Sequence, residues 1–94
     1  MKVLNPRRLR AFEAAHPDAS ANLRTWWRTA QTAQWESFND IRRTFNSADR
    51  VGDRVIFNIR GGYYRLVTWV DFDRQLVVMK WFGTHAEYDR GEWQ

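Results

Sequence analysis

The sequence contains no cysteine and, in 94 residues, only two prolines and five glycines. The absence of cysteine excludes a disulfide framework and any thiolate metal site, so we expect a domain of this size to be stabilised by packing alone. The two histidines, His16 and His85, lie far apart in the sequence, which argues against a zinc site. We therefore expect neither a metal ion nor another cofactor.

The sequence also has no apolar run long enough for a signal peptide or a membrane span. We therefore expect a cytoplasmic protein without a membrane partner. A chain of this length fits one domain, which we take to span residues 1–94. Lys and Arg outnumber Asp and Glu by 15 to 11, for a net charge of +4, and this excess of positive charge favours an anionic partner.

The first half of the chain shows the apolar spacing of helices. Leu9, Phe12 and His16 recur at helical spacing until Pro17 ends the first helix, and Asp18 is the predicted N-cap of the second. The second helix carries an apolar stripe at the i, i+3, i+4, i+7 spacing of a core-facing surface: Leu23, Trp26, Trp27 and Ala30. We interpret this double tryptophan as core and not as a platform for stacking bases.

A third, shorter helix is predicted after Ser37, because Ser37 and Asp40 have the spacing of a capping box. After residue 50 the apolar period changes from 3.6 to 2, and strand-like runs cover residues 54–60, 63–70 and 75–82. Val3 and Leu4 add a short first strand. The order predicts an α+β fold with two or three N-terminal helices packed on one face of a small, mainly antiparallel sheet.

The pair Gly61-Gly62 predicts a two-residue hairpin turn, because both positions of a type I′ turn need positive φ. This turn sets the strand register. One face then collects apolar residues: Val55, Phe57, Ile59, Tyr64, Leu66, Thr68 and Val70. The opposite, open face collects Arg54, Ile56, Asn58, Arg60, Tyr63, Arg65, Val67 and Trp69.

The second turn is predicted as a four-residue loop over 71–74, which pairs Arg65 with Lys80 and adds Val77, Met79 and Trp81 to the apolar face. Like charges placed opposite each other destabilise a sheet that has no ligand. The facing pair of Arg65 and Lys80 is therefore explained either by a bound anion or by simple solvation of the two basic side chains in water. Aromatic residues on the same face favour single-stranded RNA. The candidate RNA-binding residues are Arg54, Arg60, Tyr63 and Trp69.

The segment after the last strand carries an imidazole, a carboxylate and a phenol within one turn: His85, Glu87 and Tyr88. Cutting RNA at its own 2′-hydroxyl needs a base, a cation and an acid, and histidine exchanges protons most readily near neutral pH. His85 is the better candidate, because His16 lies on an apolar stripe where a packed role is expected. Glu87 has a second interpretation, since Thr84 and Glu87 also have the spacing of a capping box.

Several segments together resemble HigB-type toxins of the RelE superfamily, over essentially the whole chain. These segments are His16-Pro17-Asp18-Ala19 with Trp26 and Trp35, then Val55–Ile59, Tyr64–Val67 and Gly83–Asp89. The resemblance implies a RelE-like α+β domain and cleavage of messenger RNA, often on the ribosome. It also implies a HigA-type antitoxin as partner, and contact with operator DNA only through the toxin–antitoxin complex.

By the same resemblance, the catalytic residues are expected to be Arg65, Lys80, His85, Glu87 and Tyr88. We expect Arg65 and Lys80 to hold the phosphate, Glu87 or His85 to act as base, and Tyr88 to stack or to orient the substrate. Two other functions stay open at this point. One is a module that binds RNA or the ribosome without cutting, and the other is a toxin of the same fold that targets DNA gyrase.

Overall fold

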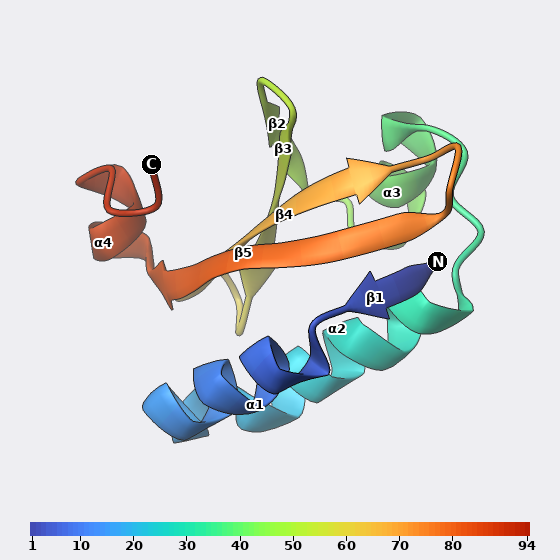
Figure 1. Cartoon of the computed structure of the whole chain (residues 1–94). Helices are drawn as coiled ribbons and strands as arrows, with labels where there is room; N and C mark the ends of the chain where they lie inside the picture. Colours follow the sequence, from blue (N-terminus) through green and yellow to red (C-terminus); the bar gives the residue numbers. More distant parts are fainter.

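The computed structural model describes residues 1–94 and has an α+β fold, as predicted. Its elements are β1 (Lys2–Leu4), α1 (Pro6–Ala15), the 3-10 helix η1 (Pro17–Ala19), α2 (Ser20–Thr32), α3 (Phe38–Thr44), β2 (Asp49–Val51), β3 (Arg54–Ile59), β4 (Tyr64–Asp71), β5 (Leu76–Thr84) and α4 (His85–Asp89). The five strands form one sheet in the order β1-β5-β4-β3-β2 (Figure 1). The sheet is mixed, because β1 is parallel to β5 while the other pairs are antiparallel.

Two strands lie at the edges of this sheet. β1, the predicted short first strand, pairs with β5 so that Val3 lies opposite Val77. β2 was not predicted, because its three residues are all exposed and show no alternation of apolar and polar side chains. None of the helices combines the length and the apolar character that crossing a membrane requires.

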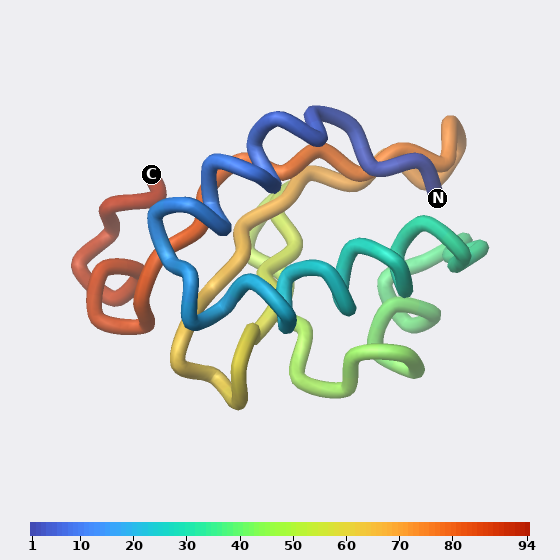
Figure 2. Tube along the Cα trace, turned by 90° about the horizontal axis from the view of Figure 1, so that it is seen from below, coloured from blue at the N-terminus to red at the C-terminus, as the bar shows by residue number.

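The hydrophobic core brings the helices and one face of the sheet together. α1 and α2 run side by side along the sheet (Figures 1 and 2), and the core includes Leu23, Trp26, Ile41, Leu66 and Met79, each at most 1% exposed. The apolar face predicted for β3 and β4 is confirmed, since all its residues are buried except the partly buried Val70. Trp26 is core as predicted, whereas Trp27 is only partly buried at the core margin.

The start of α2 differs from the prediction. Asp18 is not the N-cap, because Pro17 begins a 3-10 turn and α2 starts two residues after Asp18, with Ala19 as its N-cap. The carboxylate of Asp18 instead accepts hydrogen bonds from the Tyr64 hydroxyl at 2.8 Å and from Arg60 at 2.6 Å. Asp18 therefore ties the helical layer to the first hairpin.

The capping box predicted for α3 is half confirmed. The hydroxyl of Ser37 accepts a hydrogen bond from the backbone N–H of Asp40. The carboxylate of Asp40 does not accept the second hydrogen bond of the box, from the backbone N–H of Ser37, and accepts from the N–H of Glu36 instead. Aspartate is one carbon shorter than the usual glutamate of a capping box, so its reach differs.

The hairpin of β3 and β4 has the predicted register. Arg54 lies opposite Trp69, and Asn58 lies opposite Arg65. Gly61 and Gly62 at the turn have φ values of 62° and 88°, in the region that other residues adopt only with strain. The two glycines thus fix which side chains of β3 and β4 share a face.

The register of β4 with β5 is different from the predicted one. Arg65 lies opposite Gly83, and the predicted pairing of Arg65 with Lys80 is wrong. The turn is displaced by one residue, because Gln75 has a φ of 58° and its side chain donates to the carbonyl of Phe72. In addition, Val67 pairs with Trp81 while Thr68 pairs with Met79, so Lys80 is the extra residue of a β-bulge.

The bulge changes which side chains of β5 face the helices. Val77 and Met79 are fully buried in the core, as predicted. Trp81 was predicted on the same face, but it lies opposite Val67, and Phe82 takes the core position. On this second face Ile56 and Val67 are also buried, although neither belongs to the main core cluster. The face away from the core therefore carries a small apolar patch beside its polar residues.

Candidate functional site

Helix α4 packs closely against the end of β5 because Gly83 lacks a side chain. A Cβ atom at Gly83 would lie 2.5 Å from two ring carbons of Trp81 and 2.9 Å from Oε1 of Glu87. Such distances are too short for any larger residue without displacement of the ring or of the carboxylate. Gly83 thus sets where the side chains of α4 lie relative to the sheet.

The start of α4 is held by a complete capping box. The hydroxyl of Thr84 accepts from the N–H of Glu87 at 3.1 Å, and Oε1 of Glu87 accepts from the N–H of Thr84 at 2.7 Å. The hydrogen bond from the Thr84 backbone is the main cause of a lowered pKa of the Glu87 carboxyl. The capping interpretation of Glu87 is confirmed, and a carboxylate held in this way is a weak acceptor for a further proton.

Three side chains form a chain of hydrogen bonds at the surface beside α4. Nη2 of Arg65 lies 2.8 Å from Nδ1 of His85, and Nε2 of His85 lies 2.7 Å from Oδ2 of Asp89. A guanidinium can only donate, so Nδ1 of His85 must accept through its lone pair. Neutral His85 then carries its proton on Nε2 and donates it to Asp89. We call these three residues the Arg65–His85–Asp89 chain.

The first hairpin turn holds Arg65 in place. Its Nη1 donates to the carbonyls of Gly62 at 2.6 Å and of Tyr64 at 3.3 Å. The backbone N–H of His85 donates to the carbonyl of Tyr63 at 3.0 Å. The glycine turn and α4 are therefore linked both through backbone atoms and through the Arg65 side chain.

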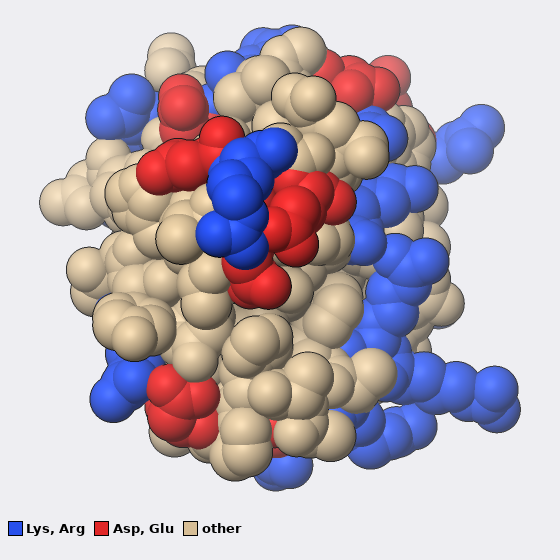
Figure 3. All heavy atoms as spheres, turned by 90° about the vertical axis from the view of Figure 1, so that its left-hand side faces the viewer, with Lys and Arg blue, Asp and Glu red and all other residues tan.

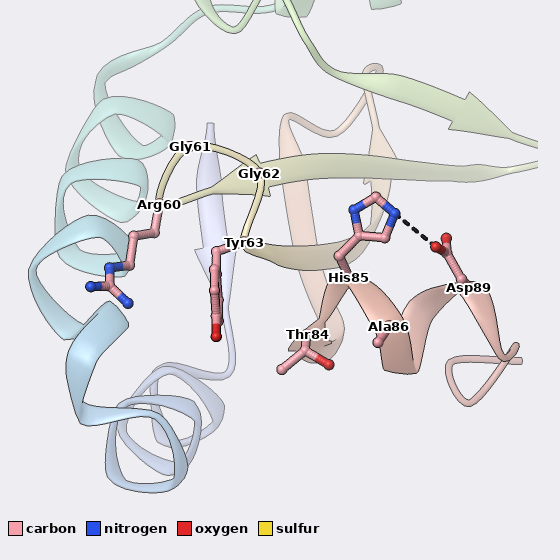
Figure 4. A pocket seen from close by; sticks show the side chains of 8 residues that line it. All are labelled: Arg60, Gly61, Gly62, Tyr63, Thr84, His85, Ala86 and Asp89. Carbon is pink, nitrogen blue, oxygen red and sulfur yellow. Dashed lines mark ion pairs between the residues drawn. The ribbon is translucent and has the colours of Figure 1, made fainter.

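Two hollows flank the Arg65–His85–Asp89 chain. The first, which we call the α4 pocket, has a volume of about 680 Å³ and is lined by Arg60, Gly61, Gly62, Tyr63, Thr84, His85, Ala86 and Asp89 (Figure 4). The second, which we call the Asn58 groove, has a volume of about 360 Å³ and is lined by Arg42, Ser47, Ala48, Asp49, Ile56, Asn58, Arg65 and Tyr88. His85 lines the first hollow and Arg65 the second, so the contact between them separates the two.

The predicted RNA-binding residues fall into two groups. Tyr63 is 62% exposed and lines the α4 pocket, and the Arg60 guanidinium lies 5.6 Å from the centre of its ring. In Figure 4 the Arg60 side chain extends away from His85, toward the helices, where it pairs with Asp18. Arg54 and Trp69 lie opposite each other at the far end of the hairpin. Each is four residues from Asn58 or Arg65, roughly 13 Å along the strand, so the structure does not bring them to the site.

Lys80 lies apart from the Arg65–His85–Asp89 chain. It is exposed at the bulge, three residues before Gly83, and the carbonyl of Lys80 accepts a hydrogen bond from Arg8 of α1. Lys80 therefore belongs with the exposed arginines of α1, and we call Arg7, Arg8 and Lys80 the basic strip. Figure 3 looks onto the α4 end, where acidic side chains gather, and shows basic side chains following its right-hand margin, the side nearest the viewer in Figure 1.

Tyr88 lies at the edge of the Asn58 groove. Burial raises the pKa of its hydroxyl, and the nearby Asp49 carboxylate adds to this effect. Its ring stacks on Trp93, with ring centres 5.2 Å apart and an angle of 10° between the planes. Tyr88 thus presents a fixed aromatic surface and a protonated hydroxyl near Arg65.

Two residues of this site were not predicted: Asp89 and Asn58. The spacing of His85 and Asp89, four residues apart on a predicted helix, was a usable signal for contact between them. Asn58 shares a face with Arg65 in the predicted register but carries no charge that would have singled it out. His16, by contrast, packs edge-on against Tyr64 and Phe82, which confirms its packed role. No three His, Asp or Glu side chains lie together as metal ligands.

Comparison with known protein families gives a match over most of the chain. Residues 19–91 match the family HigB_toxin, described as the RelE-like toxic component of a toxin-antitoxin system. This range contains Asn58 and all three residues of the Arg65–His85–Asp89 chain. A search of curated proteins found no match.

Proposed function

Since this chain belongs to the HigB_toxin family of RelE-like toxic components of toxin-antitoxin systems, we propose that it is a ribonuclease that cuts messenger RNA at the Arg65–His85–Asp89 chain. The observation that carries this proposal is the pair of hydrogen bonds at 2.8 Å and 2.7 Å that joins a phosphate-binding cation, an imidazole and a carboxylate. Family membership establishes a toxin with an antitoxin partner, and the chemistry is inferred from these three side chains.

The first step is removal of the proton from the ribose 2′-hydroxyl. A phosphate of the RNA competes with His85 for the Arg65 guanidinium, because charged phosphate oxygens are stronger acceptors than a neutral imidazole. Nδ1 of His85 is then free to take the 2′-hydroxyl proton, and Asp89 stabilises the resulting imidazolium through the proton on Nε2. Proton transfer to a positioned side chain contributes about 10²- to 10⁴-fold to a rate. Glu87 does not take this role, because it caps α4.

The second step is departure of the 5′-oxygen. The 2′-oxygen forms a bond to phosphorus while the bond from phosphorus to the 5′-oxygen breaks, and Arg65 stabilises the negative charge of the intermediate. Tyr88 lies beside Arg65 and carries its proton at neutral pH, as an ordinary tyrosine does, and burial raises its pKa further. It is therefore the candidate donor of a proton to the 5′-oxygen. The products are a 2′,3′-cyclic phosphate and a 5′-hydroxyl, and no metal ion is required.

The basic strip has a separate part in this proposal. Arg7, Arg8 and Lys80 are exposed and form no ion pair within the protein. They are suited to contact the RNA backbone away from the cut, in messenger RNA or on the ribosome. Lys80 is thereby proposed as a binding residue and not as a partner of Arg65. A HigA-type antitoxin, a cytoplasmic location and contact with operator DNA only through the antitoxin complex complete the proposal.

Addition of the purified protein to a translating extract tests this function. The proposal expects new 5′-hydroxyl ends within coding regions, which disappear in the His85→Ala variant. Stalled translation with intact messenger RNA would instead identify a module that binds without cutting. Loss of DNA supercoiling with intact transcripts would identify a gyrase-targeting toxin.

A further inference from the structure

We propose that the Asn58 groove binds one nucleobase of the substrate, next to the scissile phosphate, and that the amide of Asn58 reads its edge. This inference rests on the proposed ribonuclease function and adds to it a residue that determines base preference. It concerns the second hollow beside Arg65, which takes no part in the proton transfers described above except through Tyr88.

The polar groups of the groove have unused hydrogen-bonding capacity. Asn58 is half-buried, and neither its amide nor the hydroxyls of Ser47 and Tyr88 have a hydrogen-bond partner in the protein. None of these atoms is among the buried polar atoms that lack a partner, so solvent reaches them. A half-buried amide that has no protein partner is available to a ligand that offers both a donor and an acceptor. Nucleobase edges present such pairs of groups.

The apolar surfaces of the groove suit a flat ring. Ile56 lines it and is only 2% exposed, so its apolar side chain forms part of a solid wall. Tyr88 is held by its stack on Trp93. Single-stranded RNA is usually recognised by stacking of splayed bases on aromatic side chains together with hydrogen bonds to the base edges. The volume of about 360 Å³ lies within the range of small-molecule sites.

The position of the groove connects it with the cut. Arg65 lies opposite Asn58 in the hairpin and reaches His85 with the same guanidinium that lines the groove. A nucleotide whose phosphate binds Arg65 can therefore place its base beside Asn58. Arg42, whose guanidinium donates to the carbonyl of Asn46, adds a second positive charge to the groove, which the Asp49 carboxylate in the same lining partly offsets. The groove thus selects a base at a fixed position relative to the scissile bond.

The chemistry of the amide predicts which base is preferred. A carboxamide pairs with adenine through two hydrogen bonds, one donated and one accepted, whereas a carboxylate only accepts and pairs with the amino group of cytosine. The Asn58→Asp substitution keeps the size and shape of the side chain but removes its donor. It should change the identity of the preferred base, and Asn58→Ala should abolish the preference.

The experiment sequences the cut sites in a random RNA pool, both free and on ribosomes. The wild-type protein should favour adenine at one position beside the cut by roughly five- to hundredfold. Asn58→Ala should remove this preference among the cuts that it still makes, and Asn58→Asp should move the preference toward cytosine. Asn22→Ala on the exposed surface of α2 is the control and should leave the preference unchanged. An unchanged base preference in Asn58→Ala would overturn the inference.

A binding measurement separates this inference from the ribonuclease function. Two 2′-O-methyl oligonucleotides that cannot be cut are compared, one with adenine and one with an abasic nucleotide at the selected position. If the random pool gives no cuts and so defines no position, a series of oligonucleotides carries the adenine at each position in turn. The side-chain amide signals of Asn58 in nuclear magnetic resonance spectra should shift with adenine only. If this occurs without any cleavage by the wild-type protein, the ribonuclease proposal is wrong and the base site stands. Equal binding and equal spectra with both oligonucleotides would contradict the base site even if RNA is cut.

Discussion

The two faces of the sheet differ in what their side chains do. The face toward the helices is closed by the main core, in which Trp26 packs edge-on against Phe57 with ring centres 5.3 Å apart. The opposite face buries only a small apolar patch around Ile56 and Val67, and its remaining side chains contact solvent, one another and α4. The Arg65–His85–Asp89 chain lies at the end of this second face.

This difference indicates that stability and chemistry are separated in the molecule. His85 and Asp89 are exposed and Arg65 is only partly buried, so none of the three is buried deeply enough to determine the free energy of unfolding. Substitutions on the helical face should therefore lower stability, and substitutions near α4 should lower RNA cleavage in a folded protein.

The largest effect is expected for Trp26→Ala. Removing this core side chain should lower the free energy of unfolding by about 3–5 kcal/mol, a large part of the total stability of a small domain. Trp69→Ala, on the opposite face and only partly buried, is the matched control and should cost about 1 kcal/mol. Urea unfolding measures both. Equal losses in the two variants would show that the second face contributes to stability as much as the core does.

Arg65→Ala should lower RNA cleavage by about 10²- to 10³-fold, because one cation that stabilises the transition state is lost. The thermal unfolding temperature should change little, since the Arg65 side chain is only partly buried. Arg54→Ala, on the same face but at the far end of the hairpin, should cleave at close to the wild-type rate. A similar loss in both variants would mean that the whole face, and not the α4 end, determines cleavage.

Asp89→Asn should lower cleavage by about tenfold, because the imidazolium of His85 loses a stabilising negative charge. Nitrogen spectra of the ring, a signal that does not depend on activity, should still show neutral His85 with its proton on Nε2, because Arg65 donates to Nδ1 and the asparagine oxygen accepts from Nε2. Asp73→Asn removes the same charge from the exposed loop after β4 and should change neither quantity. Cleavage at the wild-type rate in Asp89→Asn would remove Asp89 from the account.

The smallest effect is expected for Glu87→Gln. This substitution should lower the free energy of unfolding by a few tenths to about 1 kcal/mol after allowance for solvent screening. The pKa of the Glu87 carboxyl is lowered in the folded state by its bond from the Thr84 N–H. The carboxylate therefore contributes its full stabilisation at pH values above its ordinary pKa of 4.5. This contribution is lost as the pH falls through the pKa of the folded state. Urea unfolding at pH 7 and pH 3 should show a difference between wild type and variant that shrinks in acid. A difference independent of pH would contradict this.

Local signals made much of the fold predictable. The α+β order follows from the change of apolar period near residue 50, and the register of the first hairpin follows from Gly61 and Gly62, which are adjacent in the chain. The second hairpin was not predictable in the same way. Its bulge at Lys80 has no local sequence signature, and β1 pairs with β5 from the other end of the chain.

The candidate site was predictable to the extent that turns and caps define it. The Thr84–Glu87 spacing correctly placed a helix start next to His85. The predicted partner of Arg65 was wrong, because the turn lies one residue further along the chain and Lys80 forms a bulge, and the two together bring Gly83 opposite Arg65. The spacing of His85 and Asp89 was a usable signal for their contact, whereas the contact of Arg65 with the same imidazole was not predictable, because Arg65 comes from a strand whose predicted register with β5 was wrong.

The most direct test of the central claim is chemical analysis of the RNA ends that the purified protein produces, with free RNA and with programmed ribosomes. We predict a 2′,3′-cyclic phosphate on one fragment and a 5′-hydroxyl on the other, no cut at a nucleotide whose 2′-hydroxyl is replaced by hydrogen, and no such ends with His85→Ala. Cleavage that leaves a 5′-phosphate, or that continues at the wild-type rate in His85→Ala, would contradict a cleavage centre at the Arg65–His85–Asp89 chain.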